Sequence, residues 1–449
     1  MVIKMKKISI WEDTTNIEKY DNLNNDTTTD VLIIGGGITG ISTLYNLNNS
    51  KLKVILVEQN RIGMGVTGKS TGKLTYLQND LLDKIRNNFN DDILLQYIES
   101  QRTIIKKITN IIKKENIDCE LEKVSSSIYT NKDDEITKLL SLKKLLEQNN
   151  IKVKNIKSNL VESKYNITVD DTYHFHPLKF IEGLLKNNKY PIYENTSIKK
   201  IEKDNDYYIC YTDKYKIKAK YIVIASHYPF FNIPYLFPIK GYLEKSYLSA
   251  STMNTKPVSL ISYSYPFISI RNYKDYLIYL SNSHSLNKDI DNDKNFKELK
   301  KKLKDLNLTP EYLWSNIDII TNDGLPYIGK IKDNLLIGTG YNTWGLANGF
   351  LAGTIITDII NNKENKYIDL FNPNRININQ ITGIVSNGIK NIDGYIKGIM
   401  NNIDNKKCPH MGCKLIYNKV ENTWDCPCHG SRFNKEGKCI SGPSNKDIE

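Results

Sequence analysis

The sequence predicts an α/β fold in the first part of the chain and a small separate folding unit at its end. The chain has 449 residues, which is more than one hydrophobic core usually organises. An apolar strand pattern at 31–34 runs through a glycine triplet into a helical pattern. Four cysteines and two histidines lie close together at 408–431, so the chemistry of this second region is local.

The composition is that of an ordinary globular protein. Apolar residues make up 40% of the chain and charged residues 25%. The formal net charge of +12 comes mostly from lysines spread along the whole sequence, without an arginine cluster or a nucleic-acid-binding motif. We therefore expect lysines on solvated faces and no nucleic-acid partner. A basic surface would also suit an acidic carrier protein or an anionic membrane face.

No targeting segment is predicted. Residues 1–21 carry positive charge, but no apolar stretch follows them, so a secretory signal is not expected. No run of about 18 apolar residues occurs, so no transmembrane helix is expected. We interpret the chain as cytoplasmic, and a peripheral contact with a membrane is compatible with this interpretation.

The first glycine cluster has the context of a dinucleotide site. In "TDVLIIGGGITGISTLYNLNN" a strand pattern precedes the glycines and a helical pattern follows them. Gly35 permits a tight turn, Gly37 lets the backbone approach a pyrophosphate, and Gly40 lets the helix pack close to the strand. The start of the helix, with Ile38 and Thr39, then directs free N–H groups at the phosphates.

A second strand pattern, "KVILVE", ends at Glu58. A carboxylate at this point accepts hydrogen bonds from a ribose 2′-OH and would repel a 2′-phosphate. A glycine motif alone is weak evidence, because a glycine-rich turn can bind nothing. The order strand, glycines, helix, strand and glutamate predicts a dinucleotide site much more strongly.

The next segment, "QNRIGMGVTGKSTGKLT", favours FAD over NAD through a resemblance. The sequence resembles FAD-dependent oxidoreductases of the D-amino-acid oxidase and dehydrogenase type, in which such a segment runs along the flavin. Three further stretches match that family in order, at 173–185, 219–229 and 321–360. The resemblance covers about 30–375, after an extension at 1–29. It implies FAD and a Rossmann-like α/β domain interleaved with an α+β substrate domain at about 230–315.

The resemblance also implies further contacts with the cofactor. They are Ser70, Thr71, Ala225, Gly340, Trp344, Gly345 and Leu346. Trp344, Gly345 and Leu346 lie at the start of a predicted helix, whose N-terminal amides can stabilise negative charge on a reduced flavin. For Trp344, a place in the core is the alternative.

Candidate substrate residues come from the same resemblance. Two antiparallel strands are predicted at 265–285, where Tyr, Ile and Phe alternate around a polar turn. The family has an arginine and a later histidine in this region, and they match Arg271 and His284. An arginine that faces a pocket can hold a substrate carboxylate as a bidentate pair; a surface position is the alternative. Lys73 is a further catalytic candidate near the flavin.

The cysteine- and histidine-rich stretch reads "CPHMGCKLIYNKVENTWDCPCHGS". Its Cys-Pro-His and Cys-x-x-His motifs can bind zinc tetrahedrally. They can instead bind a 2Fe-2S cluster, with two thiolates on one iron and two imidazoles on the other. One extra cysteine lies in each loop, at Cys413 and Cys428, and a zinc finger has no use for that pair.

The pattern resembles, nearly residue by residue, the Rieske domains of respiratory cytochrome complexes. That resemblance implies a small all-β domain at 401–449. It implies a Rieske-type 2Fe-2S cluster on Cys408, His410, Cys426 and His429. It also implies a disulfide between Cys413 and Cys428 that ties the two ligand loops together.

The chain departs from that family at three points. Ser431 matches a serine that donates to the cluster sulfurs, but Phe433 stands where the family has a tyrosine, and one hydrogen bond fewer should lower the reduction potential. The segment before the first ligand loop is short and is interpreted as a linker at 376–400, so the cluster is expected to depend on docking against the FAD domain. Cys439 has no role in the family pattern and is expected to be a small buried residue.

The order of the two parts resembles a class of two-domain bacterial FAD/Rieske proteins whose substrates are undefined. A flavin takes two electrons as a hydride, whereas a 2Fe-2S cluster takes one electron at a time. Placing both carriers in one chain makes the transfer intramolecular and raises the effective concentration of the acceptor. We expect an FAD-dependent dehydrogenase of a small amine or amino acid. Its electrons would pass from FAD to the cluster and on to a one-electron acceptor protein or quinone.

Two other functions stay open at this point. One is an oxygen-using oxidase whose metal-bound tail only supports folding, and the other is a non-enzymatic redox sensor. A Rieske oxygenase is set aside, because it needs a mononuclear iron site of two histidines and a carboxylate. The histidines outside the cluster motif lack suitable spacing; they are His174, His176, His227 and His284.

Overall fold

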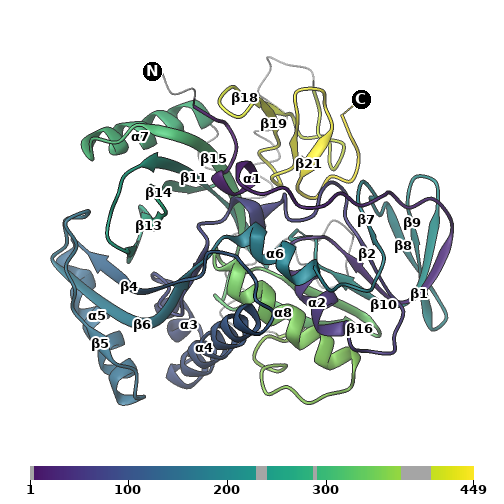
Figure 1. Ribbon diagram of the computed structural model, residues 1–449, viewed down its shortest axis with the longest axis horizontal. Coiled ribbons are helices and arrows are strands. Elements are labelled where there is room, and N and C mark those ends of the chain that lie inside the picture. The colour runs from purple at the N-terminus through teal and green to yellow at the C-terminus, as the bar shows by residue number, and fades with distance from the viewer. Residues whose placement is uncertain (1–4, 229–239, 287–290, 376–405, 449) are drawn as a thin grey trace.

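The computed structural model describes residues 5–228, 240–286, 291–375 and 406–448. Three β-sheets organise them, and most of the helices pack around the first two (Figure 1). The predicted linker at 376–400 lies outside the described residues. The α/β, α+β and small all-β parts that the sequence predicts are all present.

The first sheet is mixed, with parallel strands at its centre. Its order is β16-β17-β10-β1-β2-β7, and the central strand β1 is parallel to both neighbours. Its strands are β1 (Thr27–Ile34), β2 (Val54–Val57), β7 (Ile192–Tyr193), β8 (Lys200–Asp204), β9 (Tyr207–Tyr211), β10 (Lys216–Ile224), β16 (Tyr327–Lys332) and β17 (Leu335–Thr339). The last four residues of β1 are all buried, because a parallel sheet is covered on both faces. Helices α2 (Ile38–Leu47) and α8 (Gly345–Ile360) pack against each other beside it.

The second sheet has the order β15-β11-β14-β13-β12-β4-β6-β3. Its strands are β3 (Lys73–Leu74), β4 (Glu122–Thr130), β5 (Val153–Lys154), β6 (Tyr165–His174), β11 (Gly241–Thr252), β12 (Ser259–Ser262), β13 (Ser269–Tyr273), β14 (Tyr276–Ser285) and β15 (Pro310–Thr321). The antiparallel pair predicted at 265–285 is confirmed as β13 and β14. The long pair β11 and β15 forms one edge of the sheet and borders the site.

The remaining helices pack around these sheets, apart from one short 3-10 helix that borders the site. They are α1 (Ile10–Asp13), the 3-10 helix η1 (Val66–Lys69), α3 (Leu81–Asn88), α4 (Asp91–Lys114), α5 (Asp133–Gln148), α6 (Pro177–Leu185) and α7 (Asn292–Asp305). The N-terminal extension is not a free tail. Trp11 is 0% exposed, and its indole Nε1 donates to the carbonyl of Ser70 at 2.7 Å. The extension therefore supports the segment that runs along the predicted flavin site.

The third sheet is small and belongs to the C-terminal unit, drawn in yellow in Figure 1. It comprises β18 (Ile416–Asn418), β19 (Thr423–Asp425), β20 (Arg432–Phe433) and β21 (Cys439–Ser441). Its core consists mainly of the cysteines with Leu415 and Phe433. Cys439 is 1% exposed, as the sequence predicted. A core this small leaves the unit dependent on its contacts with the rest of the chain.

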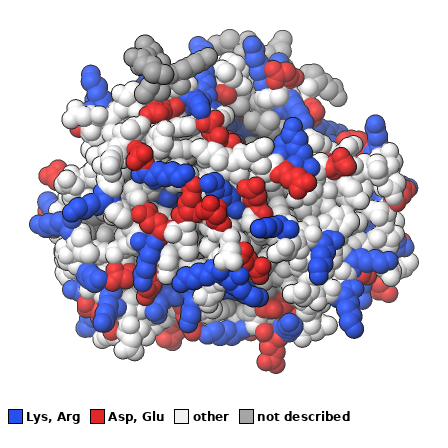
Figure 2. Space-filling view, viewed as in Figure 1, with Lys and Arg blue, Asp and Glu red and all other residues white. Residues whose placement is uncertain are grey.

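Charged side chains of both signs alternate over the face shown in Figure 2. This view agrees with the expectation that the surplus lysines are dispersed. Among the described residues, no helix is both long and apolar enough to cross a membrane.

Candidate functional site

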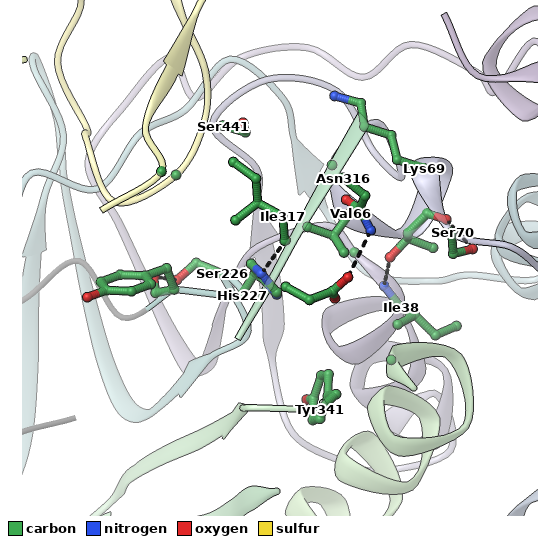
Figure 3. A pocket seen from close by; sticks show the side chains of 18 of the residues that line it. Ile38, Val66, Lys69, Ser70, Ser226, His227, Asn316, Ile317, Tyr341 and Ser441 are labelled. Carbon is green, nitrogen blue, oxygen red and sulfur yellow. Dashed lines mark hydrogen bonds between the residues drawn. The ribbon is translucent and has the colours of Figure 1, made fainter. Parts of the chain in front are cut away.

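A large cavity lies where the first sheet, the second sheet and the C-terminal unit meet (Figure 3). It holds about 2150 Å³ of space, its open mouth included. Its lining includes the glycine turn after β1 and the second ligand loop of the C-terminal unit.

The glycine turn has the geometry that the sequence predicts. Gly35 has φ +114°, and a Cβ there would lie 2.6 Å from the carbonyl oxygen of Ala225. A Cβ on Gly40 would lie 1.9 Å from the carbonyl oxygen of Gly35, so this glycine permits close packing and does not itself line the cavity. Gly37 caps α2 and lines the cavity together with Ile38 and Thr39. The turn thus leaves the start of α2 open to a phosphate.

Glu58 lines the cavity beside this turn. Its carboxylate accepts hydrogen bonds from the backbone N–H groups of Gly36 at 2.7 Å and Asn60 at 2.8 Å. Burial raises the pKa of Glu58, although these backbone donors act in the opposite direction. The carboxylate is therefore held in a fixed position, where a ribose hydroxyl could donate to it.

The other predicted cofactor contacts lie along the same cavity, with one exception. Ser70, Thr71, Ala225, Trp344, Gly345 and Leu346 line it. Gly340 does not: it has φ +73°, and a Cβ there would lie 2.5 Å from Thr321 Cγ2, so it serves the turn after β17. Trp344 Nε1 is buried without a hydrogen-bond partner among the described residues. An orphaned donor at the N-terminus of α8 fits a site that a polar ligand completes.

The expectation that Arg271 faces the pocket is not met. Arg271 is 2% exposed, and its guanidinium donates to the carbonyls of Gly72 at 2.6 Å, Asn272 at 2.8 Å and Phe175 at 3.2 Å. It also stacks over Trp11, 5.4 Å from the ring centroid. The guanidinium therefore joins the segment around Gly72 to the second sheet. It is neither free to anchor a substrate carboxylate nor placed on the surface.

His284 and Lys73 also lie outside the cavity lining. The ring of His284 bonds the Tyr247 hydroxyl at 3.2 Å and the Ser285 carbonyl at 3.1 Å. Lys73 is buried, and its ammonium donates to the Leu260 carbonyl at 2.9 Å and to Ser269 Oγ at 2.8 Å. Burial lowers the pKa of Lys73 well below its usual value, and Arg271 adds to this effect. Lys73 thus bonds Ser269, which lines the cavity, but neither Lys73 nor His284 belongs to the lining itself.

Sequence reasoning missed the cavity-facing residues of β11 and β15. On β11 these are Leu243, Glu244, Ser246 and Leu248, and on β15 they are Ser315, Asn316, Ile317 and Asp318. Glu244 is the direct cross-strand partner of Asp318, and Ser246 that of Asn316. The available signal was an acidic residue within each strand, Glu244 in β11 and Asp318 in β15. It becomes informative only once the two strands are known to pair.

His227 and Tyr228 follow β10 and continue the lining toward the C-terminal unit. His227 has φ +63°, and its Nε2 bonds the carbonyl of Ile317 at 3.1 Å (Figure 3). Burial lowers the pKa of His227 to about 4. The imidazole is therefore neutral at physiological pH and fixes the turn against β15.

The two loops of the C-terminal unit assemble the predicted metal ligands. The Cys408 and Cys426 thiols are free and buried, and the rings of His410 and His429 lie 5.0 Å apart. Both histidine Nδ1 atoms are buried without a hydrogen-bond partner among the described residues. Two thiolates and two unsatisfied imidazole nitrogens fit the donor set of a Rieske-type 2Fe-2S cluster.

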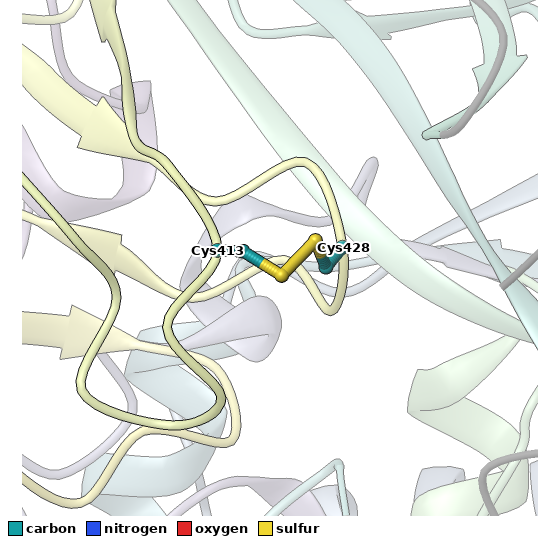
Figure 4. Close-up of a disulfide and its surroundings, with 2 residues drawn as sticks. All are labelled: Cys413 and Cys428. Carbon is teal, nitrogen blue, oxygen red and sulfur yellow. A yellow bond between two sulfur atoms is a disulfide. The ribbon is translucent and has the colours of Figure 1, made fainter. Parts of the chain in front are cut away.

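The disulfide implied by the sequence is present between Cys413 and Cys428 (Figure 4). Each ligand loop is also closed by backbone hydrogen bonds, from Cys408 N to the Cys413 carbonyl and from Cys426 N to the Ser431 carbonyl, both at 2.7 Å. The disulfide joins the two loops, so the ligands remain in place relative to one another. Since the bonded sulfurs are not thiolates, these two cysteines are not ligands.

The second ligand loop faces inward. His429 and Gly430 line the cavity, and the ring of His429 packs edge-on against Tyr228 with 6.3 Å between centroids. A Cβ on Gly430 would lie 3.2 Å from Leu243. His429 therefore borders the cavity, because its loop docks on β11 and β15.

A buried ionic network joins the C-terminal unit to the same two strands. Lys245 of β11 donates to Asp425 at 2.7 Å, and Arg432 pairs with both Asp425 and Glu421. Glu421 in turn accepts from the backbone N–H of Ser315 at 3.0 Å. Burial alone would raise the pKa of Asp425, but Arg432 and Lys245 outweigh it and hold the pKa below its usual value.

Because of this network, the β11–β15 pair both borders the cavity and holds the C-terminal unit. Glu244 and Ser246 face the cavity, whereas Lys245 between them reaches the C-terminal unit. Breaking a buried ion pair by removing one partner typically costs about 3–5 kcal/mol. The cluster loops are thus held against the wall of the cavity.

Comparison with known proteins agrees with this geometry. Residues 30–359 match the family described as FAD dependent oxidoreductase, and residues 401–449 match the Rieske [2Fe-2S] domain. YhfW of Bacillus subtilis (strain 168), whose name describes a Rieske 2Fe-2S iron-sulfur protein, is 27% identical over 98% of this chain and 96% of its own. Gamma-glutamylputrescine oxidoreductase of Escherichia coli (strain K12) is 23% identical over 76% of this chain and 85% of its own.

Solved structures show the same fold in the first part of the chain. Glycine oxidase from Geobacillus kaustophilus superposes with a TM-score of 0.63 at 16% identity, over 78% of this chain and 99% of its own. The remaining part of this chain includes the C-terminal unit, which the second family match covers.

Proposed function

This chain belongs to the FAD dependent oxidoreductase family and ends in a Rieske [2Fe-2S] domain, and on that premise we propose that it is a dehydrogenase of a small amine or amino acid. In this proposal, electrons taken up at FAD leave through the 2Fe-2S cluster of the same chain to a one-electron acceptor protein or quinone. We place the oxidoreductase unit at 30–375 and the Rieske unit at 401–449.

The observation that carries the proposal is the position of His429 in the cavity lining. A flavin can accept a hydride and release its electrons singly, and a 2Fe-2S cluster accepts one electron at a time. A ligand of the cluster that borders the flavin cavity makes the step between them short and intramolecular. His410 and the exposed Met411, which is 51% exposed, belong to the other ligand loop and offer an exit to an external acceptor.

The residues proposed to hold each cofactor are those whose geometry fits it. For FAD they include Gly35, Gly37 and Glu58 at one end and Trp344 and Gly345 at the other. For the cluster they are Cys408, His410, Cys426 and His429. Arg271, His284 and Lys73 are not retained as catalytic residues, because none of them lines the cavity and their polar groups are already hydrogen-bonded within the protein.

Replacing Lys245 with methionine tests whether docking matters for electron transfer. The change removes the ammonium that bonds Asp425 and Asn292, so the Rieske unit should be held less firmly. We expect flavin-to-cluster transfer to slow at least tenfold while both cofactors remain bound. The measurement is anaerobic light-driven reduction of the flavin, followed by the paramagnetic signal of the reduced cluster.

Lys300→Met serves as the matched control, because Lys300 is an exposed lysine on α7. It should transfer electrons at the wild-type rate. If Lys245→Met also transfers at that rate, the buried network does not set the position of the cluster.

Replacing Phe433 with tyrosine is expected to raise the reduction potential of the cluster. Phe433 is 0% exposed and packs among the cysteines of the ligand loops. A hydroxyl at this position could donate to a cysteine sulfur, and such hydrogen bonds raise the potential. Redox titration of the two proteins, with Tyr417→Phe as a control for an unrelated hydroxyl, checks this. A potential that stays constant or falls in Phe433→Tyr would contradict it.

A further inference from the structure

The cavity contains carboxyl groups that neither cofactor explains. Glu244 and Asp318 are direct cross-strand partners on β11 and β15, and both line the cavity. Opposed residues of an antiparallel pair project from the same face of the sheet, so the two carboxyls share one part of the wall. Asp80, at the start of α3, acts on Glu244 as a third acidic group.

Glu244 lacks the partners that a buried carboxylate normally has. It is 7% exposed, and within the described part of the chain its carboxylate makes no hydrogen bond or ion pair. Asp318 accepts one hydrogen bond, from Asn316 Nδ2 at 3.2 Å. Burying an ionised carboxylate without a partner is costly. An acid that is nine-tenths buried and lines a cavity therefore indicates a ligand whose polar group pairs with the carboxylate.

Two of the positive groups near this wall already have partners. Lys84 is the cation that acts on Glu244, and its ammonium donates to the Thr321 carbonyl at 2.7 Å. Arg432 pairs with Asp425 and Glu421. With three carboxyls around one lysine, this part of the cavity carries a surplus of negative charge.

A substrate carboxylate finds no suitable arginine here. Of the arginines that line the cavity, Arg432 is paired as above, and Arg61 binds Glu194 at 2.9 Å near the turn that follows β2. Lys69 also lines the cavity, but burial lowers its pKa, and the acidic groups that act on it are Glu12 of α1 and Glu421 and Asp425 of the C-terminal unit. The polar chemistry of the β11–β15 wall thus suits a cation and not an anion.

The titration of the two acids is consistent with such a ligand. Burial raises the pKa of Glu244 to about 7, with Asp318 and Asp80 acting in the same direction and Lys84 against them. Burial also raises the pKa of Asp318 to about 7. Near neutral pH the pair can therefore hold or release a proton, and a bound cation would favour its ionised form.

We propose that Glu244 and Asp318 bind the ammonium group of the substrate, which is an apolar amine without a carboxylate on the reacting carbon. This inference rests on the proposed function, in which a small molecule is oxidised at FAD. One carboxylate takes a proton from the ammonium, giving a neutral amine and a carboxylic acid, so that the nitrogen lone pair becomes free. The apolar part of the substrate lies against Leu248, Ile261 and Leu280, which line the same cavity.

A titration of the FAD-loaded protein tests the inference without turnover of the cluster. The probes are n-pentylamine, norleucine, which is the same amine with an added carboxylate, and hexanoate, which lacks the amine. Binding is followed anaerobically by the change in the flavin absorbance bands. We expect pentylamine to bind at least tenfold more tightly than norleucine, and hexanoate to bind most weakly. Equal or tighter binding of norleucine would overturn the proposal.

Glu244→Gln and Asp318→Asn keep the shape of each side chain and remove its charge. Each should weaken pentylamine binding at least tenfold, whereas Glu364→Gln, at an exposed acid, should leave it unchanged. FAD content and the paramagnetic signal of the cluster report whether each variant is folded. Unchanged amine binding in both folded variants would overturn the proposal.

The pH dependence of the wild type supplies a measurement that needs no variant. Pentylamine stays protonated between pH 6 and 9, so a loss of affinity as the pH falls through about 7 reports protonation of the acids. The titratable groups that face Glu244 are Asp318, Asp80, Lys84 and Tyr242, and the acids among them are Asp318 and Asp80. Affinity that is independent of pH in this range would contradict the proposal. Light-driven flavin reduction requires no amine, so failure of electron transfer to the cluster is detected separately.

Discussion

The Cys426→Ser variant is expected to lose at least 100-fold of its activity with cytochrome c as the electron acceptor, while its flavin is still reduced by substrate. Cys426 is a free, buried thiol opposite Cys408, and the fit of the site assigns it to the cluster. A serine hydroxyl is a poor replacement for a thiolate ligand, so the cluster should be lost. Cytochrome c is a probe of suitable size, because it cannot enter the cavity to reach the flavin directly.

Cys439→Ser is the matched control for this change. Cys439 lies in the same small core, is also free and buried, and its Sγ lies 3.2 Å from the Ser444 carbonyl. It should retain the cluster signal and the activity with cytochrome c. If Cys426→Ser instead turns over as fast as the wild type with every acceptor, oxygen included, the cluster is structural and the chain is an oxidase.

The Gly37→Leu variant is expected to purify without FAD. Gly37 caps α2 and lines the cavity, and the nearest atom to a Cβ there would be Thr67 Oγ1, at 3.3 Å. A methyl group there is tight and requires a small shift of Thr67, whereas a leucine side chain would also extend into the space proposed for the pyrophosphate. The ratio of flavin absorbance to protein absorbance measures the effect.

Gly37→Ala gives the graded comparison and should retain more FAD than Gly37→Leu. The cluster signal should remain in both variants, since the ligand loops lie at the other end of the cavity. A Gly37→Leu protein that is fully yellow would show that the pyrophosphate binds elsewhere.

The features that could be predicted from the sequence are those fixed by short, local patterns. A strand, three glycines and a helix specify the turn at Gly35, because the positive φ and the close packing at Gly40 leave no room for a Cβ. The two cysteine–histidine loops are likewise local, and the disulfide joins residues only fifteen positions apart.

The substrate wall could not be predicted in the same way. Glu244 and Asp318 are adjacent only because β11 and β15 pair across more than seventy residues. Arg271 shows the same limit for a residue that the sequence did single out. An arginine on a predicted strand was expected to serve a ligand, but the sheet turns it toward the carbonyls of Gly72 and Phe175. Which face of a strand borders a cavity is decided by the neighbouring elements and not by the strand itself.

The inward position of His429 could not be predicted from the sequence either, because it depends on segments that are distant along the chain. The ligand loop is a local motif, but its docking surface is formed by Leu243, Ile317 and Tyr228 from distant segments. The short segment before the loop did suggest that the cluster depends on the FAD domain. It could not indicate which side of the cluster the domain would cover.

In our proposal, the flavin and the cluster exchange electrons within one chain, across the wall formed by β11 and β15. The most direct test is to reduce the flavin of the wild-type protein with light, anaerobically and without substrate, and to follow the cluster signal over a hundredfold range of protein concentration. We expect the cluster to be reduced with a first-order rate constant that does not change with concentration. A rate constant that rises in proportion to protein concentration would contradict intramolecular transfer. A cluster that stays oxidised while the flavin is reduced would contradict it as well.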